Sequence, residues 1–188
     1  SSLITLNFDS TEKSKSPIEL TWTDGGIRPP HPDIIPADSD IGGPDSQNGV
    51  LMIGEKGIIS TNINDSSPLT PKLYLYDGQT EFGPETEDMP EPEYGHQRKW
   101  VDACKAGFRS KEHLDLTSSF DYAGPMTETV LMGNLAIRSY MLRNEKSNGG
   151  FDYYARKKLL WDGDNMKITN IEEANQFVTR EYREGWKI

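Results

Sequence analysis

The stretch GPMTETVLMGNLAIRSY, residues 124–140, predicts a helix whose composition constrains the rest of the fold. At 100° per residue, its apolar side chains from Val130 to Ile137 cover the whole circumference, and only Asn134 interrupts them. A helix at the surface of a small protein keeps one polar side. We therefore expect one side of this helix to pack on a sheet. The other side needs a second body, which is another layer of this chain, another subunit or another domain.

The first half of the chain predicts strands, because β-branched and aromatic residues cluster there between turn residues. Residues 3–8 and 18–23 are expected to form a hairpin with a long loop. Further strands are expected at 49–55, 57–63 and 72–78, and surface loops at 24–48 and 79–92.

The second half predicts mainly helices. Residues 94–107 have an amphipathic pattern that ends at Gly107. One side of this helix carries His96, Trp100, Ala103 and Cys104, the last expected to be a core residue. Pro125 fits the first turn of the next helix. Residues 157–162 and 166–170 bracket a turn, and Asn170 is expected to cap a short helix at 171–178. Together these elements predict an α+β class, with an open, mostly antiparallel sheet and helices on one face.

The composition limits the classes of partner that the chain is expected to bind. The 188 residues carry a net charge of −10, which argues against nucleic acid because phosphates need clusters of Lys and Arg. No apolar run is long enough to span a membrane, and no signal peptide is visible. The chain opens inside an expected strand and without Met, so we expect a piece of a longer protein. The compartment, cytoplasmic or periplasmic, stays open.

Signatures of common chemistry are missing. The chain has neither a Gly-rich dinucleotide fingerprint nor a phosphate-binding loop, so it is expected to bind no cofactor by itself. Cys104 and the scattered His31, His96 and His113 do not make a convincing metal-ligand set. No catalytic residue is therefore assigned to this chain.

Three residues are candidates for substrate binding. His96 lies in the first turn of its expected helix, where the positive end of the helix dipole disfavours imidazolium, and a neutral imidazole can hydrogen-bond a substrate hydroxyl. Asp24 and Tyr122 lie at element ends beside loops, where either can line a cleft. A structural role remains the alternative for all three residues.

Five segments in series resemble the C-terminal domain of the Gfo/Idh/MocA family of oxidoreductases, the relatives of glucose–fructose oxidoreductase and inositol dehydrogenase. The resemblance extends over almost the whole chain, and it is strongest to the bacterial branch with a Pro-rich insertion. The segments are IELTWTDGGIRPPHPD (18–33), NGVLMIGEKGII (48–59), GHQRKWVDACKAG (95–107), SSFDYAGPMTETVLMGNLAIRS (118–139) and KKLLWDGDNMKITNIEEANQFVTREYREGW (157–186).

The resemblance implies a two-domain parent with an N-terminal Rossmann domain that binds NAD or NADP and acts on a sugar or polyol. It implies homo-oligomers formed through the sheet face, and a Rossmann domain beside the helix at 124–140. The family's Gly-rich fingerprint, Glu-Lys-Pro motif and catalytic Asp and His have no counterparts in this chain. Only the Gly95-His96 pair matches a position near the cleft of some relatives.

The leading hypothesis is therefore a substrate and oligomerisation domain that is inactive by itself. One alternative is a stand-alone α+β module that binds carbohydrate or self-associates. Another is a domain of an NAD-dependent glycoside hydrolase, which shares the implied fold but cleaves glycosides through transient oxidation.

Overall fold

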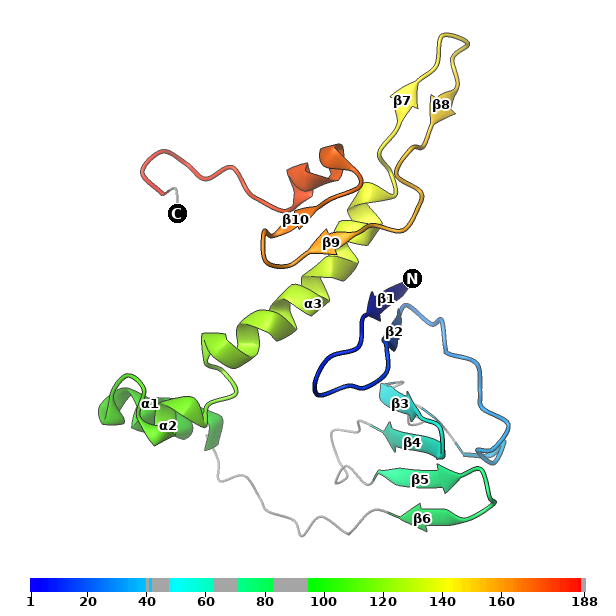
Figure 1. Ribbon diagram of the computed structural model, residues 1–188, viewed down its shortest axis with the longest axis vertical. Helices are drawn as coiled ribbons and strands as arrows, with labels where there is room; N and C mark the ends of the chain where they lie inside the picture. The colour runs from blue at the N-terminus through cyan, green and yellow to red at the C-terminus, as the bar shows by residue number, and fades with distance from the viewer. Residues whose placement is uncertain (40, 42–47, 63–70, 83–94, 187–188) are drawn as a thin grey trace. The chain divides into compact units, whose positions relative to one another are not determined.

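The computed structural model describes residues 1–39, 41, 48–62, 71–82 and 95–186 (Figure 1). The chain divides into two compact units, one made of Ser1–Ile27 with Lys99–Ile188 and the other of Arg28–Arg98. The predicted α+β class is confirmed, and all strand pairs are antiparallel. The described strands form four small sheets where one open sheet was expected, because each strand pairs only with a strand next to it in sequence.

The first unit opens with the hairpin of β1 (Leu3–Phe8) and β2 (Ile18–Thr23), whose bounds match the prediction. The pairing runs from Leu3 opposite Thr23 to Phe8 opposite Ile18. Directly opposed residues share a face, so this register gathers apolar side chains on one side of the hairpin. That side carries Ile4, Leu6, Phe8, Ile18, Leu20 and Trp22.

The long helix α3 (Phe120–Ser139) begins four residues before Gly124. Pro125 therefore lies inside the helix, and the prediction that it lies in the first turn is wrong. Gly124 helps to explain this, because a Cβ before proline would collide with the proline ring in helical backbone. The Thr129 hydroxyl donates a hydrogen bond to the Pro125 carbonyl at 3.0 Å.

A C-terminal layer packs against α3. It consists of β9 (Trp161–Asp162), β10 (Lys167–Ile168) and the 3₁₀ helix η1 (Glu172–Phe177). Its buried cluster contains Ala155, Ile168, Ile171 and Ala174, against which Leu135 of α3 packs.

Two asparagines hold this layer together. The Asn175 side chain accepts a hydrogen bond from Ile168 N at 2.7 Å and donates one to Ile168 O at 2.9 Å. Asn170 was predicted to cap η1, and this prediction is wrong, because Ile171 occupies the cap position. Its side chain accepts from Leu160 N and donates to Lys158 O, which secures the strand-like segment before β9.

Two short helices and a hairpin complete this part of the chain. Helix α1 (Gly95–Ala106) ends where predicted, at Gly107 with a φ of +97°. Ala103 is buried, but Trp100 and Cys104 on the predicted apolar side are exposed, so Cys104 is not the expected core residue. The sequence reading had not predicted α2 (Lys111–Leu114), β7 (Asn144–Glu145) or β8 (Phe151–Asp152).

The second unit contains the four-stranded sheet β3-β4-β5-β6. The predicted loop at 79–92 begins with a strand, and its residues 83–92 lie outside the described residues. Residues 24–39 and 41 have no regular structure, as predicted, but they are not only surface. Ile35 and Ile41 are buried with Ile58 and Tyr74 of the sheet. The strands of this sheet are β3 (Gly49–Ile53), β4 (Gly57–Asn62), β5 (Lys72–Leu75) and β6 (Thr80–Phe82).

Candidate functional site

The two sides of α3 differ in their surroundings. On the packed side Gly133 and Ser139 are buried, and a Cβ at position 133 would lie only 3.2 Å from Ile4 Cδ1 of β1. Glycine at 133 therefore lets the hairpin approach the helix closely.

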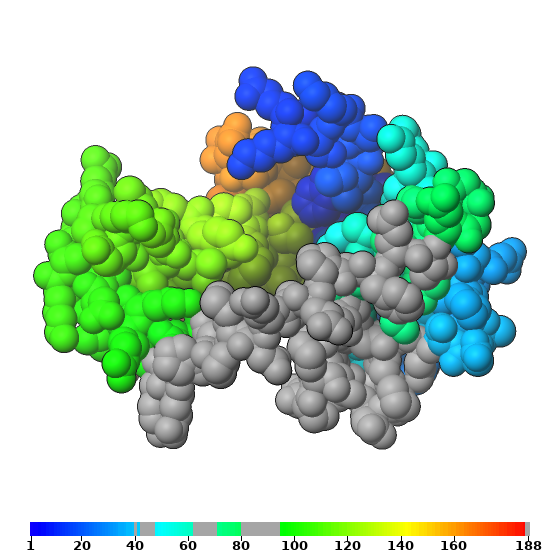
Figure 2. Space-filling view, turned by 90° about the horizontal axis from the view of Figure 1, so that it is seen from below, coloured from blue at the N-terminus to red at the C-terminus, as the bar shows by residue number. Residues whose placement is uncertain are grey.

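The other side of α3 carries large apolar side chains that are exposed. We call Met126, Val130, Leu131 and Ile137 the exposed α3 stripe; their exposed fractions are 56%, 65%, 51% and 47%. Figure 2 shows the yellow-green surface of α3 continuing from the green surface of the shorter helices. The second body expected for this helix is therefore not supplied by the described residues of this unit. Met126, Val130 and Ile137 fall within about 40° of one another around the helix, and exposed apolar surface of this kind marks interaction sites in soluble proteins.

Asp24 is held by the start of the chain. Its carboxylate accepts hydrogen bonds from the backbone nitrogen of Ser2 at 2.6 Å and from the Ser2 hydroxyl at 2.9 Å. The hydroxyl contact, followed by the backbone contact, lowers the pKa of Asp24 below its ordinary value of 3.8. Both bonds join the two ends of the β1–β2 hairpin, which matches the structural alternative for this residue.

Tyr122 and His96 are the other two sequence candidates. Tyr122 lies in the first turn of α3 and is 57% exposed, and no hydrogen bond or ring contact between it and Asp24 is found in the described part of this unit. His96 lies in the first turn of α1, as predicted, and is exposed. It belongs to the second unit. The three residues therefore stay predictions.

A hollow of about 340 Å³ lies in the Pro-rich loop of the second unit. That volume is at the lower end of ligand pockets. The two ring nitrogens of His31 lie 3.2 Å from the Pro32 carbonyl and 3.0 Å from the Ser39 carbonyl, so the ring is fixed between backbone acceptors. The hollow's polar walls offer the donor and acceptor types that hydroxyl groups need. It is lined by Arg28, Pro29, His31, Ala37, Asp38, Ser39 and Ile41.

A second polar arrangement joins α3 to the C-terminal layer. The indole nitrogen of Trp161 donates a hydrogen bond to Glu128 Oε1 at 2.7 Å. A Cβ at Gly163 would lie 3.1 Å from the same oxygen, so glycine leaves room for the carboxylate. The sequence reading missed this pair because its residues are 33 positions apart, and no local pattern links them.

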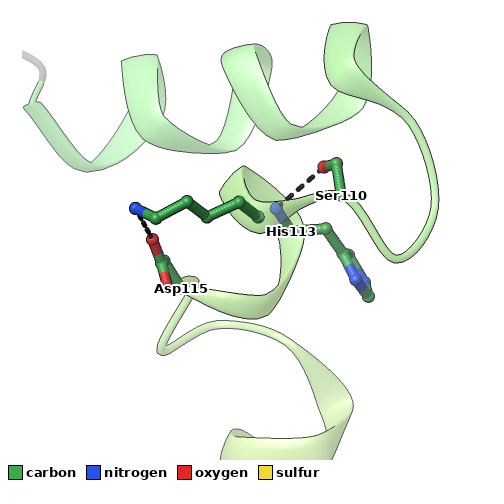
Figure 3. A network of polar contacts seen from close by, with 4 residues as sticks. Ser110, His113 and Asp115 are labelled. Carbon is green, nitrogen blue, oxygen red and sulfur yellow. Dashed lines mark hydrogen bonds and ion pairs between the residues drawn. The ribbon is translucent and has the colours of Figure 1, made fainter.

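The polar network around α2 is structural. Ser110 Oγ caps the helix by accepting from His113 N at 3.1 Å, and Lys111 Nζ pairs with Asp115 at 2.8 Å (Figure 3). The hydrogen bond that Lys111 donates to Asp115 raises the pKa of Lys111 above its ordinary value of 10.5. The His113 ring lies 5.2 Å from that of Phe108, centroid to centroid. This network organises a turn between helices.

Across the described ranges, no group of three or more His, Cys, Asp or Glu residues is placed to hold a metal ion. None of the helices described here is long and apolar enough to cross a bilayer.

Comparison with known proteins gives no family for the chain. No protein-family model matches it, and neither does any curated protein. The resemblance drawn from the five segments therefore stays a prediction.

Proposed function

We propose that the chain is the C-terminal substrate and oligomerisation domain of a nicotinamide-dependent oxidoreductase that acts on a sugar or polyol. The observation that carries the proposal is the exposed α3 stripe. It lies on the helix for which the family resemblance implies a neighbouring Rossmann domain. In this proposal the Rossmann domain covers the stripe and binds NAD or NADP, and this chain alone transfers no hydride.

The free energy that burial of the exposed α3 stripe would contribute supports an interface. Fully burying a Val, Leu, Ile or Met side chain contributes roughly 1.5–3 kcal/mol. The four residues of the stripe are about half exposed, so covering each contributes roughly half of that, which together is still a sizeable part of a domain's typical stability of about 5–15 kcal/mol. A helix that exposes them to water forgoes this contribution. A partner domain that covers them gains it, and the gain holds the two domains in one arrangement.

The sheet of the second unit offers a separate surface for self-association. One face packs on the loop residues Ile35 and Ile41. The opposite face carries Val50, Met52 and Ile59, which are 39%, 57% and 38% exposed and lie in register across β3 and β4. An apolar sheet face of this kind is suited to a second copy of the chain, as the resemblance implies for the family.

The substrate class rests on the polar groups of the chain. The hollow in the Pro-rich loop is lined by the polar residues Arg28, Asp38 and Ser39, whose side chains are of types that bind hydroxyls. His96, in the first turn of α1, is proposed to face the substrate in the complete enzyme. The hydride chemistry belongs to the nicotinamide cofactor, and the protein positions the substrate carbon against it.

Calorimetric titration of the 188-residue chain with NAD and with NADP is the first test. Neither titration is expected to give a binding heat, because the chain has no Gly-rich turn at a helix N-terminus to hold a pyrophosphate. Tight binding of either dinucleotide would contradict the proposal.

The second test uses the chain together with its nucleotide-binding domain. Reduction of NAD or NADP in the presence of sugars and polyols is expected, and Val130→Asp in the stripe should lower the rate at least about tenfold by opening the interface. Val101→Asp, at an apolar α1 position that is 40% exposed, is the matched control and should leave the rate nearly unchanged. Equal effects of the two variants would show that the stripe is not part of the domain interface.

A further inference from the structure

Two arginines stack on three aromatic rings beside the β7–β8 hairpin. Arg143 Cζ lies 3.9 Å from the centroid of Phe151, and Arg156 Cζ lies 3.5 Å from that of Tyr153 and 4.6 Å from that of Tyr140. These distances are well inside the range in which a cation is attracted to a ring face. We call these five residues the arginine–aromatic cluster.

Tyr153 is the centre of this cluster. Arg156 covers the face of its ring, whereas Arg143 Nη1 donates a hydrogen bond to its hydroxyl at 2.9 Å. Arg156 Nε also donates to the Tyr140 carbonyl at 3.4 Å. Both guanidinium groups are therefore held in fixed orientations before any ligand arrives. Fixing a side chain in advance reduces the entropy that binding would otherwise cost.

The charges of the cluster are not neutralised. Both arginines are exposed, and neither forms an ion pair with a carboxylate in the described ranges. Glu145 lies opposite Phe151 in the hairpin, but no ion pair joins it to Arg143. Lys157 and Lys158 follow Arg156 directly and are also exposed. Arg143 and Arg156 thus form a local cationic surface on a protein whose net charge is −10.

The remaining guanidinium donors define the ligand. A guanidinium group presents five N–H donors in a planar fork that matches a carboxylate, and the stacked arginines use only one such donor each within the cluster. The two forks lie at different parts of Tyr153, one over its face and one at its hydroxyl. A ligand that meets both therefore needs at least two carboxylates separated by a linker.

We infer that the arginine–aromatic cluster is a docking surface for an acidic peptide segment of a partner protein, with at least two carboxylates. Exposed Tyr140 and Phe151, at 53% and 41%, add the aromatic contact area typical of protein interfaces. Arginine and tyrosine are also the residues in which binding energy concentrates.

Fluorescence anisotropy with labelled peptides tests this inference on the full chain. The probe is a short peptide with two Glu-Glu pairs joined by Gly-Ser, and the control peptide has Gln at all four positions. The Glu peptide should bind, more weakly as salt rises, and the Gln peptide should not. Equal binding of the two peptides, or tighter binding of a single-stranded oligonucleotide, would overturn the inference.

Variants locate the contact. The double variant Arg143→Gln/Arg156→Gln should weaken Glu-peptide binding at least about tenfold, because charge-assisted hydrogen bonds to both carboxylates are lost. Arg143→Lys/Arg156→Lys keeps the charge and the hairpin but loses the planar fork, and should fall between the double Gln variant and the unmodified chain. The matched control Lys157→Gln/Lys158→Gln removes the same charge beside the cluster and should change affinity less than about threefold. A loss as large in this control as in the arginine variant would show general charge attraction and overturn the proposed site.

Discussion

The two sides of α3 differ in the size of their residues, and only one side is packed. The packed side has the small residues Gly133 and Ser139 where β1 and the C-terminal layer approach. The exposed side has the large residues Val130, Leu131 and Ile137. Small residues thus mark where elements of the same unit come close to the helix. Large apolar residues without such a neighbour mark the surface that we assign to a partner.

Substitution of one isoleucine from the packed layer and one from the exposed stripe should give the largest difference in unfolding free energy. Ile168 is 1% exposed in the layer that covers the packed side, whereas Ile137 on the stripe is 47% exposed. Ile168→Ala is expected to cost about 2–5 kcal/mol of unfolding free energy, because it leaves a cavity in the buried cluster. Ile137→Ala should cost less than about 1 kcal/mol, close to the range of surface substitutions. Urea unfolding of the two variants checks this difference, and equal losses would show that the stripe is packed in the isolated chain.

Asn175 should have the next largest effect, because its side chain brackets the backbone of Ile168 with two hydrogen bonds. Asn175→Ala leaves partly buried backbone groups without these partners and should cost about 1–3 kcal/mol. Asn175→Asp keeps the acceptor and loses the donor, so its cost should be smaller. Thermal unfolding measures both variants. Unchanged thermal stability of Asn175→Ala would show that the C-terminal layer is held by apolar packing alone.

Substitutions at Gly133 test how closely β1 packs on the covered side of α3. Gly133→Val places a branched side chain where even a Cβ lies 3.2 Å from Ile4 Cδ1, and overpacking of this kind costs typically about 1–3 kcal/mol. Gly133→Ala meets only the movable tip of Ile4 and gains helix propensity, so its effect should be much smaller. Chemical denaturation of both variants measures the difference. Equal stability of the Val variant and the unmodified chain would contradict close packing of the hairpin on α3.

Asp24 should give the smallest effect, which depends on pH. Its folded-state pKa is lowered, so its contribution is present above the ordinary value of 3.8 and is lost as the pH falls through the lower folded value. Asp162, whose pKa is lowered by hydrogen bonds from Asn165, contributes in the same window. Asp24→Asn should therefore reduce the loss of Tm on acidification without abolishing it. An unchanged acid profile would show that the bonds between Asp24 and Ser2 do not persist in solution.

Local patterns made the regular elements predictable. The β1–β2 hairpin follows from its alternating apolar residues, and the end of α1 follows from Gly107. The start of α3 was misplaced because Pro125 is treated as a first-turn residue, whereas the preceding Gly124 tolerates it within the helix. The β7–β8 hairpin was missed even though Asn148-Gly149 is a typical turn pair, and Gly149 has a φ of +81°.

Contacts over long sequence separation could not be predicted in the same way. The Glu128–Trp161 bond and the burial of Ile35 from an irregular loop depend on tertiary packing, which hydrophobic periodicity does not report. The arginine–aromatic cluster is closer to a readable pattern, because Arg143 and Arg156 flank a hairpin with aromatic residues at 151 and 153. A search for aromatic and basic residues around the turn would have found it.

Oxidative footprinting of methionine tests the assignment of the exposed α3 stripe most directly. Met126 of the stripe and Met166 of the β9–β10 turn are 56% and 52% exposed, so both should be oxidised at similar rates in the isolated chain. When the nucleotide-binding domain is present, Met126 should become protected at least about tenfold while Met166 stays reactive. Unchanged oxidation of Met126 in a mixture that transfers hydride would contradict the stripe as the domain interface.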